Sequence, residues 1–149
     1  MLGNLDPSAR IAIAGVIPAQ QAAPGVVTST WVDMAKFYAV LASLNVGVIG
    51  AAGTVDAKIE QATDANGTGA KAITGLALVQ IAKAGGDNRQ AGINVRQEDL
   101  DKNGGFRFVR VSVTVGGAAT FLSASLTGFD ARYGAGSANQ LGTTATAIS

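Results

Sequence analysis

Alternation of apolar and polar residues runs through much of the chain and predicts β-strands. In FRFVRVSVTV, valines occupy every second position from Val109 to Val115. Successive side chains of a strand point to opposite faces of a sheet, so this spacing buries one face and leaves the other in water. The segment TVDAKIEQ repeats the pattern, with Val55, Ala57 and Ile59 on its apolar side. Both segments are predicted to be strands with a single buried face.

Other segments have weaker strand patterns. VVTSTWVD, residues 26–33, is rich in β-branched residues, which strands favour. QAGINVR is expected to bury Ile93 and Val95. LALVQIA, residues 76–82, is a short apolar run that favours a strand and also fits a turn of helix.

The segment MAKFYAVLASLNVGVIG fits two periods. Met34, Phe37 and Leu41 follow helix spacing, whereas Tyr38 and Val46 belong to a set with the period of two expected of a buried strand. That set also includes Val40 and Leu44. The β-branched residues and glycines at the end of the segment favour the strand.

Clusters of Gly, Asn and Asp separate these segments and predict turns. About seven or eight short strands joined in this way indicate an all-β fold, an antiparallel β-sandwich resembling a jelly roll. We expect one core domain over residues 27–134. No helix longer than a turn or two is predicted.

The two ends of the chain differ from this core. Residues 1–26 contain Pro7, Pro18 and Pro24, which make a central strand improbable and favour an edge or extended segment. We expect them to form an extended N-terminal arm. Residues 135–149 are small and polar and predict a flexible C-terminal tail.

Composition narrows the functional classes. The 149 residues are 48% hydrophobic and 14% charged, which is typical of a globular chain rather than a disordered one. The net charge is +1 and the basic residues are scattered, so direct nucleic-acid binding is not expected. No apolar run approaches the length of a membrane span.

The chain contains neither cysteine nor histidine. This composition excludes disulfides, thiol nucleophiles, Cys/His zinc sites and a Ser-His-Asp triad. We therefore expect no enzymatic activity, no cofactor and no metal centre.

The loop DANGTGAK is the segment most similar to a chemical site. Asp64 and Asn66 offer oxygen ligands for calcium, but no further acid follows until Asp87. The glycines followed by Lys71 resemble a phosphate loop but lack its spacing and its Ser or Thr. Asn-Gly is also common turn chemistry, so we interpret the loop as a turn.

Two other groups of residues have both a chemical and a structural interpretation. Glu98, Asp99 and Asp101 offer paired carboxylates, yet three acids in one polar loop are more typical of a solvated turn. Phe106 and Phe108 lie on the strand face opposite the valines, where exposed apolar side chains usually mark contacts. We expect both aromatic residues to contact a covering arm or another subunit.

The arm also has a candidate contact surface. Its strand-like run contains Ile11, Ile13 and Val16, which we expect to take part in the same kind of interface. An extended segment of this kind can add a strand to the sheet edge of a neighbour.

An ordered set of segments resembles a family of small structural proteins from the head modules of tailed bacteriophages. The segments are STWVDMAKFYAVLASLNVGVIG, TVDAKIEQATDANGTGAKAI, DNRQAGINVRQEDLD, GFRFVRVSVTVGG and LTGFDARYG. They cover roughly Ser29 to Gly134. The resemblance implies a virion component, most directly a capsid decoration or cement protein. It brings no catalytic residues with it.

The resemblance also implies partners and a location. The major capsid protein is the expected partner, and a homotrimer or other homo-oligomer is the expected state. The chain would be made in the host bacterial cytoplasm and reside on the capsid surface of the virion. A head-tail connector, tail or fibre-base component remains an alternative, as does a carbohydrate- or calcium-binding module.

Overall fold

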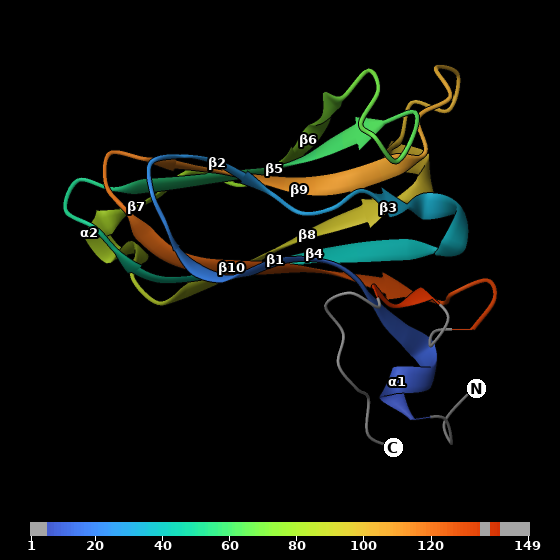
Figure 1. Cartoon of the computed structure of the whole chain (residues 1–149), viewed down its shortest axis with the longest axis horizontal. Helices are drawn as coiled ribbons and strands as arrows, with labels where there is room; N and C mark the ends of the chain where they lie inside the picture. Colours follow the sequence, from blue (N-terminus) through green and yellow to red (C-terminus); the bar gives the residue numbers. More distant parts are fainter. Residues whose placement is uncertain (1–5, 135–137, 141–149) are drawn as a thin grey trace.

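The chain folds into two antiparallel β-sheets that pack face to face, visible as two stacked layers in Figure 1. The computed structural model describes residues 6–134 and 138–140. The first sheet has the strand order β1-β10-β4-β8. The second has the order β2-β9-β5-β6, with β3 added to β9 and β7 added to β5. The predicted all-β sandwich is confirmed.

The strands of the first sheet are β1 (Ile11–Ala22), β10 (Thr120–Phe129), β4 (Ala39–Ile49) and β8 (Arg89–Arg96). Those of the second are β2 (Gly25–Thr28), β3 (Val32–Asp33), β5 (Thr54–Ala62), β6 (Lys71–Ala77), β7 (Ile81–Ala82) and β9 (Phe108–Gly116). Short helical turns are α1 (Pro7–Arg10), η1 (Met34–Lys36), α2 (Lys83–Gly86) and η2 (Gln97–Asp99). No helix of the described residues is long and apolar enough to cross a membrane.

The described residues form ten strands, more than the seven or eight predicted. β3 and β7 account for the difference because each is only two residues long and extends the pairing of a longer strand. Segments this short leave no periodic pattern in a sequence.

The core is the layer of apolar side chains between the sheets. The valines at 109, 111, 113 and 115 all face it, as do Val55, Ala57 and Ile59. The first sheet contributes Val40, Leu44, Val95 and Leu126, among others. The alternation that predicted β5, β8 and β9 therefore identified their buried faces correctly.

The ambiguous segment is a strand from Ala39 onward, as its β-branched end indicated. Val40, Leu44 and Val46 are buried, but Tyr38 is 75% exposed. Tyr38 lies one residue before the strand begins, so it does not share the buried face expected for it. The helix-like spacing before it corresponds to the short turn η1.

The N-terminal segment is part of the sandwich rather than a separate arm. Ile11–Ala22 form β1, which pairs with β10 at one edge of the first sheet. Ala12 and Ile17 are buried in the core. Pro18 lies where the pairing register shifts, so its missing N–H is accommodated at an edge, as the prolines required. The expected boundary at Val27 thus separates no arm from the core.

The apolar run 76–82 is not one strand. β6 ends at Ala77 and β7 begins at Ile81, and between them Val79 is 91% exposed. The backbone keeps contact with β5 only through Leu78, whose N–H donates to the carbonyl of Ala57 at 2.8 Å.

Most of the expected C-terminal tail, residues 135–149, lies outside the described residues. Of this segment, residues 138–140 contact the free edge of β1. The N–H of Ile13 donates to Asn139 Oδ1 at 2.8 Å, and Gln140 N–H donates to the Ile13 carbonyl at 2.7 Å. These bonds satisfy part of an edge that would otherwise be open.

Replacing Leu126 with alanine tests the core. Leu126 is 0% exposed, so Leu126→Ala should lower the free energy of unfolding by about 2–5 kcal/mol through lost burial and a cavity. Val79→Ala, at a side chain in water, should change it by less than about 0.5 kcal/mol. Urea denaturation of the two variants measures both values. Equal effects would contradict the assigned core.

Candidate functional site

The first sheet is nearly free of charge, although 14% of the chain is charged. Strands β1, β10 and β4 contain no Asp, Glu, Lys or Arg. The remaining strand, β8, has only Arg89 and Arg96, one at each end. The water-facing side of β1, β10 and β4 therefore presents a continuous neutral surface.

We call this surface the uncharged face. Its side chains alternate with buried ones along each strand, and the pairing register places them in rows. Its members are Ile11, Ile13, Val16 and Gln21 of β1, Phe121, Ser123, Ser125, Thr127 and Phe129 of β10, and Leu41, Ser43 and Asn45 of β4.

The centre of the uncharged face is flat and its ends are aromatic. Ser125 lies between Val16 on β1 and Ser43 on β4, so the middle row has only small side chains. Phe121 and Phe129, at the two ends of β10, are 50% and 36% exposed. Exposed rings beside a neutral surface are typical of a contact region.

A shallow depression surrounds Phe121. Its volume is about 400 Å³, and amide side chains of Gln20, Gln21 and Asn45 border it. Polar amides beside an aromatic ring can orient a polar ligand, so this depression is a second candidate feature of the same face.

The outer side of the second sheet is charged instead. Glu60 on β5 pairs with Lys58 at 3.2 Å and with Arg110 on β9 at 2.8 Å. Partial burial raises the pKa of Glu60, but the hydrogen bonds and charges of Arg110 and Lys58 outweigh it, so the pKa lies below its usual value. The Arg110 guanidinium also stacks over Trp31 at 4.5 Å. This face is solvated and internally paired.

The structure places the predicted contact residues on two separate surfaces. Ile11, Ile13 and Val16 lie on the uncharged face. Phe108 begins β9 at the end of the second sheet, whereas Phe106 lies two residues before the strand, and each has a cation against its ring. Lys71 Nζ lies 4.2 Å from the Phe106 ring, and the Arg107 guanidinium lies 5.2 Å from that of Phe108.

A groove lies at one end of the sandwich, where η1 and η2 connect to their strands. One part is a cavity of about 320 Å³ lined by Met34, Gln97, Leu100, Lys102, Phe106 and Arg132, among others. An adjoining cavity of about 450 Å³ has Tyr38, Ala39, Arg96 and Glu98 in its lining and shares Gln97 and Lys102. We call the two together the end groove.

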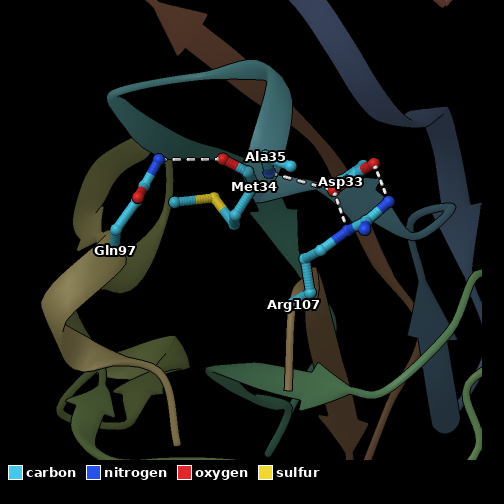
Figure 2. Close-up of polar contacts among 5 residues, drawn as sticks. All are labelled: Asp33, Met34, Ala35, Gln97 and Arg107. Atoms are coloured by element: carbon cyan, nitrogen blue, oxygen red, sulfur yellow. Dashed lines mark hydrogen bonds and ion pairs between the residues drawn. The ribbon is translucent and has the colours of Figure 1, made fainter. Parts of the chain in front are cut away.

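Hydrogen bonds fix the walls of the end groove, as Figure 2 shows. Asp33 Oδ1 accepts from Ala35 N–H at 2.9 Å and from Arg107 Nε at 2.7 Å, while Oδ2 accepts from Arg107 Nη2 at 2.7 Å. The hydrogen bonds that Arg107 donates to Asp33, together with the charge of that carboxylate, raise the pKa of Arg107. Gln97 Nε2 donates to the carbonyls of Met34 at 3.1 Å and Phe37 at 2.6 Å.

In the loop DANGTGAK, the Asp64 carboxylate accepts hydrogen bonds from groups of the loop itself. Asp64 Oδ1 accepts from the N–H groups of Asn66 and Thr68, and Oδ2 accepts from the Thr68 hydroxyl at 2.6 Å. These bonds lower the pKa of Asp64, the Thr68 hydroxyl most strongly. Gly67 adopts the positive φ of 84°, with no room for a Cβ beside Trp31. The structure supports the interpretation of this loop as a turn.

The neighbouring acids also have separate structural partners. Asp101 pairs with Lys71 at 2.6 Å, Glu98 pairs with Arg96 at 3.1 Å, and Asp99 accepts from the Arg96 N–H at 2.7 Å. Within residues 6–134 and 138–140, no three acidic side chains gather in a way that would hold a metal ion.

Sequence comparisons give no assignment. No family model matches the chain, and no curated protein matches it.

Solved structures show similarity at low identity. Infectious bursal disease virus, Gx strain, matches with a TM-score of 0.46 and 11% identity over 87% of this chain and 37% of that one. Broad Bean Stain Virus matches with a TM-score of 0.44 and 10% identity, over 85% of this chain and 88% of that one. The xylan-binding domain CBM22-2 from Paenibacillus barcinonensis matches with a TM-score of 0.40 and 8% identity, over 75% of this chain and 88% of that one. The likeness is one of the jelly-roll sandwich alone.

The lowered pKa of Asp64 predicts a pH effect. In the unfolded chain the Asp64 carboxylate takes up a proton at about pH 3.9, the ordinary value for Asp. In the folded protein the same carboxylate stays charged to lower pH. This stabilisation is therefore present above that value and lost as the pH falls through the folded-state pKa.

Asp64→Asn should consequently lower the melting temperature near neutral pH, and the gap to the parent should narrow below about pH 4. Thermal unfolding followed by circular dichroism across this range measures the gap. Asn66→Ala serves as the control because its side chain makes no hydrogen bond to any described residue, and its gap should not change with pH. A constant gap for Asp64→Asn would refute the assignment.

Proposed function

We propose that the chain is a virion structural protein of a tailed bacteriophage, a capsid decoration (cement) protein that binds and stabilises the lattice of the major capsid protein. The observation that carries the proposal is the uncharged face. A decoration protein needs a broad contact surface rather than a reaction site, and this face is the broadest neutral surface that the two sheets offer.

The composition of the uncharged face supports contact with protein. Interface cores are depleted in charged residues and enriched in aromatic ones. Its three strands, about 4.8 Å apart and each about eleven residues long at about 3.3 Å per residue, span about 500 Å². That area is more than half of the roughly 800 Å² that each partner buries in a stable interface of standard size.

The sequence supports the phage context independently. The segments that resemble phage head-module proteins cover roughly Ser29 to Gly134, which includes the β4 and β10 strands of the uncharged face. Many copies on a repeated lattice would add their weak contacts through avidity. In this proposal the protein is a homotrimer or other homo-oligomer on the capsid surface, without enzymatic activity, cofactor, membrane or nucleic-acid partner.

Placing a charge in the centre of the uncharged face tests the proposal. Ser125→Arg would bury an unpaired guanidinium at the contact, which costs several kcal/mol, so capsid binding should fall by about tenfold or more. Thr114→Arg, on the outer side of the second sheet, is the matched control and should bind normally. Phage heads assembled without the protein are mixed with each variant, and the bound fraction is measured by co-sedimentation.

The proposal fails if Ser125→Arg binds heads as well as the parent does while both variants remain folded. The double variant Phe106→Ser/Phe108→Ser, included in the same assay, shows whether the aromatic end of the second sheet also contributes. Copy number separates the alternatives: hundreds per particle support decoration, whereas about a dozen indicate a connector.

The depression at Phe121 favours a second candidate function, binding of a neutral carbohydrate. An aromatic ring bordered by Gln20, Gln21 and Asn45 offers both a stacking surface and amide hydrogen bonds. If this is correct, Phe121→Ala should abolish a signal in a glycan array that Ser125→Arg retains. An absence of glycan signal for the parent protein excludes this candidate.

A further inference from the structure

We propose that the end groove binds an acidic peptide segment of another protein, whose carboxylates pair with Lys102 and Arg132 while its apolar side chains contact the floor formed by Met34 and Leu100. This inference goes beyond the proposed function and does not depend on it. The end groove and the uncharged face adjoin at one end of the first sheet, where Ala39 lines the end groove and pairs with Phe129 of the uncharged face.

Charge complementarity is the first reason for an acidic ligand. The carboxylates around the groove already have partners: Asp33 pairs with Arg107, Glu98 with Arg96, and Asp101 with Lys71. By contrast, Lys102 and Arg132 both line the groove and have no ion pair among the described residues. The groove therefore presents two uncompensated positive charges to its contents.

The walls of the groove are preorganised. Gln97 bridges η2 to the backbone at both ends of η1, because its Nε2 donates to the carbonyl of Met34 (Figure 2) and to that of Phe37. The bidentate pair between Asp33 and Arg107 holds the opposite wall. A ligand would not have to order these elements, which lowers the entropic cost of binding.

The floor selects for apolar side chains. Met34 and Leu100 line the cavity as its buried apolar floor, at 2% and 7% exposure, and the more accessible ring of Phe106 lines it with them. A free phosphate would gain nothing from this floor. A peptide with alternating acidic and apolar residues would use both the floor and the two cations.

Two observations favour a peptide over a nucleic acid. The ring of Phe106, which lines the groove, already has Lys71 stacked on it, so it is not free to stack on a base. Two cations are also far fewer than the basic patch that a phosphate backbone requires.

The acidic ligand in this proposal belongs to another chain. The parts of the sequence outside the described residues are residues 1–5, 135–137 and 141–149, which read MLGNL, AGS and LGTTATAIS. None contains Asp or Glu. These three segments therefore offer no acidic side chain for Lys102 and Arg132.

A binding assay on the isolated protein tests the inference. A fluorescein-labelled peptide of alternating glutamate and leucine is titrated with the protein, and fluorescence anisotropy gives the Kd. Lys102→Glu and Arg132→Glu should each raise the Kd about fivefold, since each replaces an attraction with a repulsion. Arg89→Glu makes the same charge change at the far end of β8 and should leave the Kd unchanged.

Amide chemical shifts locate the bound peptide. With isotopically labelled protein, the largest shifts should occur at Gln97, Lys102 and Gly105. The inference is overturned if no binding occurs, if Arg89→Glu weakens binding as much as Lys102→Glu, or if the shifts lie elsewhere. Tighter binding of an alternating lysine-leucine peptide or of a single-stranded oligonucleotide would also overturn it. Because Ser125→Arg should bind the peptide normally, failure here is distinct from failure of capsid binding.

Discussion

The structure depends on one layer of apolar side chains between two sheets. Strand β9 lies between β2 and β5 in its sheet, and every second residue from Val109 to Val115 is buried in that layer. The opposite sheet meets these valines with Leu126, Val40 and their neighbours. Since a strand commits only alternate side chains to such a layer, both outer faces remain free to acquire different chemistry.

The two outer faces have diverged in charge. On β5 and β9, Glu60 and Arg110 form an ion pair on the outer side of the second sheet. The uncharged face has no such groups on its three longest strands. Charged side chains therefore lie on the outer side of the second sheet and are absent from β1, β4 and β10 of the first. A surface of this kind is suited to contact with protein, since it imposes no cost for burying charge.

The end groove follows from how the sandwich is closed at that end. Two turns, η1 and η2, each connect a strand of one sheet to a strand of the other. Gln97 and Asp33 fix these turns by hydrogen bonds to backbone groups. Turns pack less completely than strands, so space remains between them and is lined by side chains from distant parts of the sequence. The groove has rigid walls because of these bonds, and its net charge is positive because Lys102 and Arg132 lack partners among the described residues.

The sequence by itself determined the strands with strong alternation and their buried faces. For β5 and β9 the period of two is enough, because one-sided burial selects each residue locally. It also identified the loop at Asp64 as a turn, while the interface expected at Ile11, Ile13 and Val16 stays a prediction. Only the tertiary structure decided that β1 is an edge strand of the sandwich and that β1, β10 and β4 lie side by side. It also brought Met34, Gln97 and Arg132 together. Strand pairing and groove walls are contacts between residues far apart in the chain, and no local pattern records them.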